Sequence, residues 1–376
     1  MQPAPQAVRE LQVGDFLPEF NLADQMARWV ALNTHALGQP LVLLFYPDNH
    51  KPACQQLLRS FAALDPRLAD LAQIFAINGE TVEANATAVD MQGLPFRLLS
   101  DPTGVAAESY GVAHNLPGAA LDFLGSGAFT SIIADENRRI LKIDRNVTDP
   151  AHAEALVAWL EARPQPAPME MPGVAPVLCV PRVLERDFCR ALIEAYETRG
   201  NEPSGTLHDS RGGAQKVKLD PSLKVRRDHH VRDPALHDRI RVAIKARVLP
   251  EIYKAYHYRV TSFEEFKIVC YEARDGGHFA PHRDNNSLSS AHRRFAMTLN
   301  LNTEDYEGGH LRFPEYGPHL YRPGTGDAVI FSCSLVHQAL PVTAGRRFVL
   351  LSFFFGDEAM QTKDQRDSGR QAGAMR

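Results

Sequence analysis

Three side chains near the C-terminal end of this 376-residue chain have the types and the spacing of metal ligands. His282 and Asp284 stand in the tripeptide His-Arg-Asp, and His337 follows much later in the sequence. Two imidazoles and one carboxylate on one face of an iron(II) ion leave the opposite face open for a co-substrate and dioxygen. The sequence therefore predicts a mononuclear iron(II) site.

The spacing of these residues indicates how they could reach one ion. Side chains at positions i and i+2 of a strand point to the same side, so we expect His282 and Asp284 on one strand. The stretch between Asp284 and His337 leaves room for several strands, so the second histidine should come from a distant strand.

An arginine ten residues after the second histidine could anchor an anion. Arg347 lies in the run RRFVLLSFFF, which is otherwise apolar after Arg346. A buried guanidinium needs an anionic partner, and a carboxylate matches its two-pronged geometry. Successive strand residues face opposite sides, so Arg346 should point away from Arg347.

The segments around these residues are rich in Phe, Val, Ile, Leu and Thr, and Gly or Pro turns separate several of them. They cover residues 294–302, 310–316, 327–333 and 346–355. Several short strands with such turns indicate a sandwich or barrel, and a jelly roll, also called a double-stranded β-helix, fits them. Residues 184–200 and 233–256 have helical apolar spacing, which predicts amphipathic helices.

Residues 266–355 resemble the 2-oxoglutarate/iron(II) dioxygenases of the prolyl 4-hydroxylase type. The likeness rests on Tyr271 and on the ordered motifs DGGHFAPHRD, TLNLN, EGGHLRFPE, PGTGDAVIF and HQALPVTAGRR. It implies that the helices over residues 184–200 and 233–256 brace one face of the jelly roll. It implies that His282, Asp284 and His337 bind iron. It also implies that Arg347 pairs with the distal carboxylate of 2-oxoglutarate and that Tyr271 helps to hold this co-substrate.

The same resemblance implies the reaction partners. They are Fe(II), 2-oxoglutarate and dioxygen, with ascorbate as an optional reductant. A prolyl or other residue of a peptide or protein is the expected substrate, and a free amino acid or another small molecule is the alternative. The basic stretch 204–230 lies where related hydroxylases carry mobile substrate loops, although a solvated loop accounts for its composition equally well.

The N-terminal part has a different pattern. Residues 41–47 and 72–78 are continuous apolar runs typical of buried strands, and helical apolar spacing lies between them. Strand, helix and strand in this order imply a parallel βαβ unit. Residues 130–143 predict a hairpin, and Asp149 with Pro150 predicts the start of a terminal helix.

Residues 10–163 resemble a peroxiredoxin of the thioredoxin fold. The matching stretches are VGDFLPEFNL, FYPDNHKPAC, FRLLSDPTGVAAESYGV and IIADENRRILKI. Cys54 stands where the family places its peroxide-reducing cysteine. It should lie in the first turn of a helix, where the helix dipole favours a thiolate.

Two of the residues that activate peroxide in that family are replaced here. Lys51 stands in place of the threonine and Phe129 in place of the arginine, and no second cysteine occurs before Cys179. We therefore predict a degenerate peroxiredoxin that serves folding, dimerisation or binding. A thiol peroxidase or peroxide sensor using Cys54 is the alternative, and a scaffold made of two degenerate enzymes is a third. The complete set of iron-site residues favours the oxygenase.

Prolines mark the boundary between the two parts. Residues 162–176 contain five prolines, which cannot propagate a helix or a central strand. We therefore expect a peroxiredoxin-like domain over residues 10–163 and a linker over residues 164–177. The dioxygenase domain should cover residues 178–357, followed by a polar tail over residues 358–376.

Composition limits the remaining possibilities. The net charge of −4 predicts no bulk attraction to nucleic acid or to an anionic membrane. The chain has no apolar run of spanning length and no signal-peptide pattern at its N-terminus. Five cysteines, with no CxxC, do not make a disulfide framework, so we expect a reducing, cytoplasmic setting. Cys179, Cys189, Cys270 and Cys333 should be inert core residues, and a homodimer through the N-terminal domain is compatible with the sequence.

Overall fold

The computed structural model describes residues 10–36, 38–114, 122–123, 129–164, 168, 170, 173–209, 215–287 and 289–359. The chain forms two compact units, Met1–Pro168 and Met169–Arg376, and each has its own hydrophobic core. The linker expected over residues 164–177 and the tail expected over residues 358–376 lie partly outside the described residues. None of the helices in the described part of the chain is long and apolar enough to cross a membrane.

The N-terminal unit is built on a seven-stranded sheet with the order β2-β1-β5-β4-β3-β8-β9. The central strands β3, β4 and β5 are parallel, and the hairpin of β8 and β9 joins β3 in the antiparallel sense. The strands are β1 (Asn21–Asp24), β2 (Trp29–Ala31), β3 (Leu41–Phe45), β4 (Gln73–Asn78), β5 (Arg97–Ser100), β8 (Phe129–Ala134) and β9 (Ile140–Val147). The expected βαβ unit and hairpin are therefore present, and the unit has the thioredoxin-like α/β fold.

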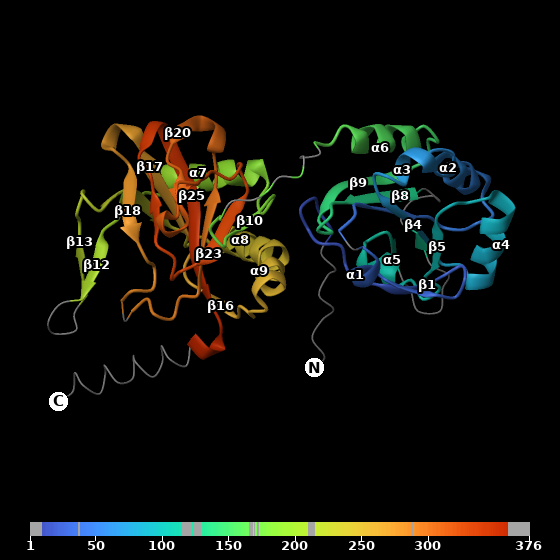
Figure 1. Cartoon of the computed structure of the whole chain (residues 1–376), viewed down its shortest axis with the longest axis horizontal. Helices are drawn as coiled ribbons and strands as arrows, with labels where there is room; N and C mark the ends of the chain where they lie inside the picture. The colour runs from blue at the N-terminus through green and yellow to red at the C-terminus, as the bar shows by residue number, and fades with distance from the viewer. Residues whose placement is uncertain are drawn as a thin grey trace. The chain divides into compact units, whose positions relative to one another are not determined.

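Helices cover both faces of this sheet because its strands are apolar on both sides. In β3, Val42 and Leu44 contribute to one core cluster, whereas Leu41 and Leu43 contribute to another. Figure 1 shows α2, α3 and α6 on one side of the sheet and α1 and α5 on the other. The helices are α1 (Leu32–His35), α2 (Pro52–Ala63), α3 (Asp65–Leu68), α4 (Val82–Gln92), α5 (Val105–Ser109) and α6 (His152–Glu161).

The start of α6 differs from the sequence prediction. The helix begins at His152 with Ala151 as its N-cap residue, not at Pro150. The Asp149 carboxylate accepts the Ala151 N–H at 2.9 Å, and the His152 N–H donates to the Asp149 carbonyl. Asp149 and Pro150 therefore form a turn that leads into the helix, a local contact that competes with helical capping.

Besides the two-stranded sheet of β12 (Thr206–Asp209) and β13 (Gln215–Lys218), the described part of the C-terminal unit contains two antiparallel sheets. The larger has the order β10-β23-β19-β25-β17-β15-β11, and the smaller has the order β14-β18-β24-β21-β22. The strands of the larger sheet are β10 (Leu178–Val180), β11 (Glu202–Pro203), β15 (Arg227–His230), β17 (Lys267–Glu272), β19 (Phe295–Asn300), β23 (Ala328–Ser332) and β25 (Val342–Phe355), with β16 (Ser262–Phe263) and β20 (Tyr306–Gly308) pairing with β25. Those of the smaller are β14 (Lys224–Val225), β18 (His278–His282), β21 (Leu311–Arg312), β22 (Leu320–Tyr321) and β24 (His337–Ala339).

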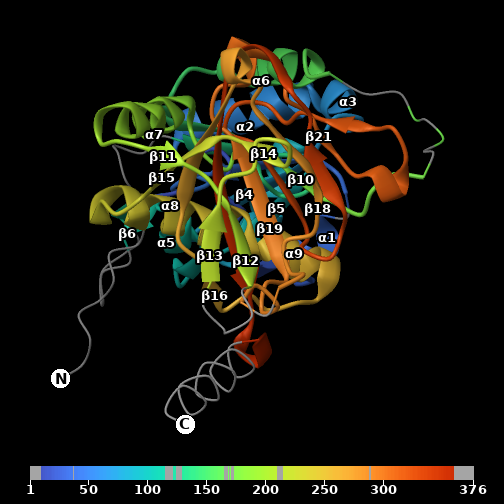
Figure 2. The same ribbon diagram turned by 90° about the vertical axis from the view of Figure 1, so that its left-hand side faces the viewer.

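Successive side chains along a strand point to opposite faces and so contribute to two separate cores. In β17, Ile268 and Cys270 pack with the helices, whereas Val269 and Tyr271 pack with residues of the second sheet. The helices are α7 (Arg186–Thr198), α8 (Pro234–Arg247) and α9 (Leu249–Tyr256). Figure 2 shows α7 and α8 on the side of the domain where β11 and β15 lie, with β18 and β21 towards the other side. Two sheets face to face with helices outside match the predicted jelly roll.

The cysteines of this unit do not all follow the prediction. Cys189, Cys270 and Cys333 are buried, but Cys179 is exposed. Cys179 lies in β10 at the edge of the large sheet, where one side of the strand faces solvent. An apolar sequence neighbourhood therefore did not determine the burial of this residue.

Candidate metal centre

His282, Asp284 and His337 come together in the C-terminal unit, with one ligand atom from each lying within 4.8 Å of the others. His282 ends β18 and His337 begins β24, and the two residues are paired directly across these neighbouring strands. Asp284 lies in the turn after β18, so the prediction that it shares a strand with His282 is wrong. Its N–H donates to the Cys333 carbonyl at 3.0 Å, which positions the carboxylate from outside the strand.

Backbone carbonyls hold both imidazole rings in one tautomer. Nδ1 of His282 lies 2.8 Å from the Ala280 oxygen. Nδ1 of His337 lies 3.0 Å from the Leu335 oxygen. In its neutral form each ring therefore carries its hydrogen on Nδ1 and presents the lone pair of Nε2 to the Asp284 carboxylate, at 3.4 Å from His282 and 3.2 Å from His337. Acceptors that face one another need a proton or a cation between them, so the three residues fit a shared metal ion.

The pKa shifts of the three groups favour a positive charge beside the Asp284 carboxylate, either a proton on His337 or a metal ion. Burial lowers the pKa of His282. Burial also favours the neutral form of His337, but the negative charge of Asp284 outweighs it and raises the pKa of His337. Burial alone would raise the pKa of Asp284, yet its interactions with the two imidazoles hold that pKa well below its usual range. The lowered pKa favours the ionised carboxylate, which is the form that binds a divalent cation.

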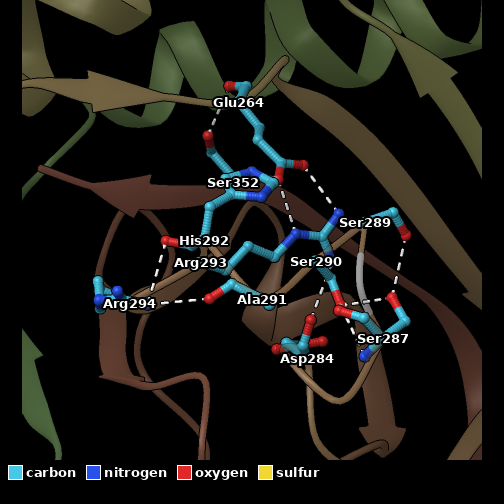
Figure 3. A network of polar contacts seen from close by, with 10 residues as sticks. All are labelled: Glu264, Asp284, Ser287, Ser289, Ser290, Ala291, His292, Arg293, Arg294 and Ser352. Atoms are coloured by element: carbon cyan, nitrogen blue, oxygen red, sulfur yellow. Dashed lines mark hydrogen bonds and ion pairs between the residues drawn. The ribbon is translucent and has the colours of Figure 1, made fainter. Parts of the chain in front are cut away.

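A salt-bridge network fixes the loop that carries Asp284 (Figure 3). Arg293 binds both carboxylate oxygens of Glu264, at 2.7 and 2.8 Å, and its Nη1 donates to the Asp284 carbonyl at 3.3 Å. Nε2 of His292 lies 2.9 Å from the same carboxylate. The Ser352 hydroxyl, on β25, donates to the Glu264 carbonyl at 2.8 Å. The network therefore ties the ligand loop to the large sheet.

Arg347 of β25 is buried opposite Tyr271 of β17. Its guanidinium carbon lies 5.3 Å from the centre of the Tyr271 ring, and its Nη2 donates to Asn300 Oδ1 at 3.4 Å. Among the described residues its Nε–H has no hydrogen-bond partner, and no carboxylate forms an ion pair with it. A buried guanidinium without a counter-ion is costly, so this group fits an anionic ligand. Arg346 points to the other face and pairs with Glu197 at 2.6 Å.

Gly309 is a site residue that the sequence analysis did not single out. Its φ is +61°, and a Cβ there would lie 2.9 Å from both Arg347 Cδ and Val342 Cγ2. Any side chain at this position would therefore displace the arginine. The glycine pair was visible as a turn signal, but its closeness to Arg347 follows from the pairing of β20 with β25.

Known families match the two units separately. Residues 13–142 match the model of the AhpC/TSA family, and residues 266–355 match that of the 2OG-Fe(II) oxygenase superfamily. The metal-ligand cluster, Tyr271 and Arg347 all lie within the second match. The chain joins an AhpC/TSA domain to a 2OG-Fe(II) oxygenase domain.

Individual relatives resemble one domain or the other. The multifunctional procollagen lysine hydroxylase and glycosyltransferase LH3 of Rattus norvegicus is 28% identical over 178 residues, which are 46% of this chain and 22% of that protein. A peroxiredoxin-like protein of Mycobacterium tuberculosis is 28% identical over 154 residues, 40% of this chain and 97% of that protein. The crystal structure of peroxidoxin BcpB from Mycobacterium tuberculosis is 27% identical and covers 42% of this chain and 100% of that chain, with a TM-score of 0.38. The chain thus spans less than a quarter of the length of its hydroxylase relative.

In the AhpC/TSA domain, Cys54 lies in the first turn of α2 but is completely buried. Burial raises the pKa of the Cys54 thiol, and the nearby charge of Lys51 does not offset it. Lys51 is itself paired with Asp48 at 3.4 Å. Phe129, in place of the family arginine, stacks on Tyr46 with ring centres 5.2 Å apart. The thiolate that the resemblance implied is therefore not favoured.

The basic stretch 204–230 approaches the metal cluster at one end. Its side chains over residues 206–218 lie outside the described residues. Lys224, by contrast, is half-buried, and its Nζ lies 5.1 Å from the centre of the Phe279 ring. Phe279 in turn stacks on His282 with ring centres 3.5 Å apart. Lys224 is thus separated from His282 by one aromatic ring, so this end of the stretch is not a fully solvated loop.

Proposed function

We propose that this chain is an iron(II)- and 2-oxoglutarate-dependent dioxygenase that hydroxylates a residue of a peptide or protein. One observation carries the assignment: a three-residue metal-ligand cluster and a buried arginine without a counter-ion occur in one oxygenase domain. A co-substrate with a chelating end and a distant carboxylate satisfies both features.

Each of these residues has a defined task in this reaction. His282, Asp284 and His337 hold the iron, and Arg347 holds the distal carboxylate of 2-oxoglutarate. The bound iron supplies the activation of dioxygen coupled to decarboxylation of the co-substrate. Overall, one C–H bond, one 2-oxoglutarate and one dioxygen give one C–OH group, succinate and carbon dioxide.

The surroundings of the cluster limit what reaches the iron. Phe279 covers one imidazole, and Phe331 lies 4.6 Å from the ring of His337. These apolar side chains keep water away from the ligands on the protein side. The Nδ1 hydrogen bonds to backbone carbonyls keep the rings oriented, so that substrate binding need not reorganise them.

A protein residue is the proposed substrate because the hydroxylase relative is named for lysyl residues of procollagen. A prolyl or another residue remains within the proposal. We propose that the AhpC/TSA domain serves binding or assembly, including a homodimer, because its cysteine is buried and its activating residues are replaced. The cytoplasmic setting stays a prediction.

The direct test uses the purified full-length chain, loaded anaerobically with Fe(II). Succinate release from 2-oxoglutarate is measured after addition of air, with and without peptides. A peptide library is then searched by mass spectrometry for products that have gained one oxygen atom, and free amino acids are tested in parallel. We expect iron-dependent succinate release and at least one hydroxylated peptide.

Two outcomes of this test would contradict the proposal in different ways. An iron-loaded chain that neither binds nor consumes 2-oxoglutarate would overturn the assignment. Hydroxylation of free amino acids alone would retain the chemistry and replace the substrate class.

A further inference from the structure

Two guanidinium groups lie near the ring of Tyr271. The guanidinium carbon of Arg347 is 5.3 Å from the ring centre and that of Arg226 is 6.0 Å from it. Nη1 of Arg226 also donates to the Tyr271 hydroxyl oxygen at 3.2 Å. Tyr271 is therefore held by one arginine while it faces another.

Arg226 occupies the step where the chain passes from the small sheet to the large one. It follows β14 and precedes β15, and its side chain is 11% exposed. Asp228 fixes it with two contacts, at 2.9 Å to Nε and 3.1 Å to Nη2. The Ser204 hydroxyl donates to the same carboxylate at 2.7 Å. Arg226 is thus held rigidly through three of its atoms, counting the donor to Tyr271.

The direction of the hydrogen bond decides what Tyr271 can do. A guanidinium has only donors, so the Tyr271 oxygen must accept from Arg226. The phenolic hydrogen is then left to find another acceptor, and none occurs among the described residues. Arg347, directly opposite Tyr271 in the strand pairing, also has donors without an anionic partner. The Tyr271 hydroxyl and the neighbouring Arg347 guanidinium are thus both available to donate to one anion.

We propose that Arg226, held by Asp228, is a positioning residue that turns the Tyr271 hydroxyl into a donor to a carboxylate of 2-oxoglutarate beside Arg347, a role that rests on the proposed function. Arg226 donates from Nη2 to Asp228, from Nε to the Ser204 hydroxyl at 3.3 Å and from Nη1 to Tyr271, and its Nε also lies within ion-pair distance of Asp228. A lysine ammonium is a single point charge and cannot repeat this geometry.

Arg226 also remains charged in this buried position. Burial would lower the pKa of Arg226, but its interactions with Tyr271 and Asp228 outweigh burial and raise it. Since Asp228 neutralises that charge, Arg226 acts on the co-substrate through Tyr271 rather than as a free cation. This distinguishes it from Arg347, which has no such partner among the described residues.

The test measures 2-oxoglutarate binding to the full-length Fe(II)-loaded protein without dioxygen, by calorimetry and by the visible charge-transfer absorbance of the complex. The variants are Tyr271→Phe, Arg226→Lys and the charge-neutral double variant Arg226→Gln/Asp228→Asn, which leaves no unpaired buried charge. Arg227→Gln is the matched control, since Arg227 is the exposed neighbour that bonds to Asn201.

We expect Tyr271→Phe and the double variant each to weaken 2-oxoglutarate binding about tenfold, the effect of losing one hydrogen bond to a charged group. Arg226→Lys should not restore binding, and Arg227→Gln should bind normally. Fe(II) affinity and turnover at saturating 2-oxoglutarate should be unchanged, so that the effect falls on KM. Combining Tyr271→Phe with the double variant should weaken binding no further than Tyr271→Phe alone.

Three results would overturn the role of Arg226. One is wild-type affinity in the double variant, and another is full additivity with Tyr271→Phe. Rescue by Arg226→Lys would also overturn it, because a diffuse positive charge would then suffice. If Arg347→Met also left 2-oxoglutarate binding unchanged, the proposed function itself would fail, so the two failures are distinguishable.

Discussion

The two domains differ in whether the buried polar groups at their candidate sites have hydrogen-bond partners. In the oxygenase domain, buried donors and acceptors are left facing one another or without a partner: the Nε2 atom of His282 and the Nε atom of Arg347 have no hydrogen-bond partner among the described residues. In the AhpC/TSA domain, the buried polar groups around the Cys54 region are satisfied internally. The Tyr46 hydroxyl, for example, donates to Asn49 and accepts from Asn78, at 2.7 Å in each case.

This difference distinguishes a site whose buried polar groups still need a ligand from one whose polar groups already bond to one another. A buried donor or acceptor without a partner is unfavourable unless a ligand forms the missing hydrogen bond. A closed amide network needs nothing further, and a buried thiol beside it is shielded from solutes. A motif residue that survives in the sequence, such as Cys54, therefore says less than the surroundings in which it is placed.

The largest effect should come from the metal ligands. His337→Ala or Asp284→Ala should weaken Fe(II) binding by about 100-fold or more and abolish turnover, because a ligand is lost outright. Metal content by atomic absorption and succinate release measure the two effects together. His319→Ala, which lies outside the cluster, is the control. Full activity in His337→Ala would sink the metal-site assignment.

Arg347→Met should give the next largest effect. Loss of a charge-assisted bidentate pair should weaken 2-oxoglutarate binding by about 10- to 100-fold while Fe(II) still binds. Anaerobic titration of the iron-loaded protein measures this directly. Arg346→Met is the matched control on the opposite face of the same strand. The reverse outcome, with Arg346 critical and Arg347 dispensable, would contradict the strand register.

Cys54 should react slowly with peroxide, at the rate of a generic thiol or below. Its pKa is raised by burial, so the thiolate fraction near neutral pH is small and should rise about tenfold per pH unit below that pKa. Stopped-flow oxidation at several pH values tests this. Cys54→Ser should leave 2-oxoglutarate turnover unchanged. Fast, saturable peroxide reduction at pH 7 would instead show that the domain is a working peroxidase.

Lys224 should produce the smallest effect, visible in the pH dependence of stability. Burial and the charge of Arg226 lower the pKa of Lys224 to about 7, compared with 10.5 for an ordinary lysine. Between these values the unfolded chain holds a proton that the folded chain releases, so the free energy of unfolding rises with pH, by at most about 1.4 kcal/mol per pH unit. Urea unfolding of the metal-free chain at several pH values should show a flatter profile for Lys224→Met. The exposed Lys245→Met should leave the slope unchanged, and an unaltered slope in Lys224→Met would contradict the shifted pKa.

Much of the fold was accessible from the sequence because its signals are local. Continuous apolar runs predicted β3 and β4, and the helical pattern between them predicted α2. Short strands separated by Gly and Pro turns predicted the sandwich. The helix start at His152 was missed by two residues, because the Asp149 side chain forms a turn there instead of a cap.

For the site, the sequence by itself determined which residue types are present and in what order. His282, Asp284, His337 and Arg347 are recognisable from motif spacing, and Lys51 and Phe129 are recognisable as departures from a pattern. Such information is carried by the chain itself and needs no knowledge of contacts.

Only the tertiary structure decided how these residues are used. In the folded chain, Asp284 lies outside the strand, where its N–H bonds to the Cys333 carbonyl. Cys54 is buried in the first turn of its helix. Arg226, in the connection between two strands, donates to the Tyr271 hydroxyl. These outcomes depend on burial and on hydrogen bonds between distant segments, which change pKa values and fix the direction of donors. Sequence spacing does not encode such long-range contacts, whereas the pairing of the two sheets creates them.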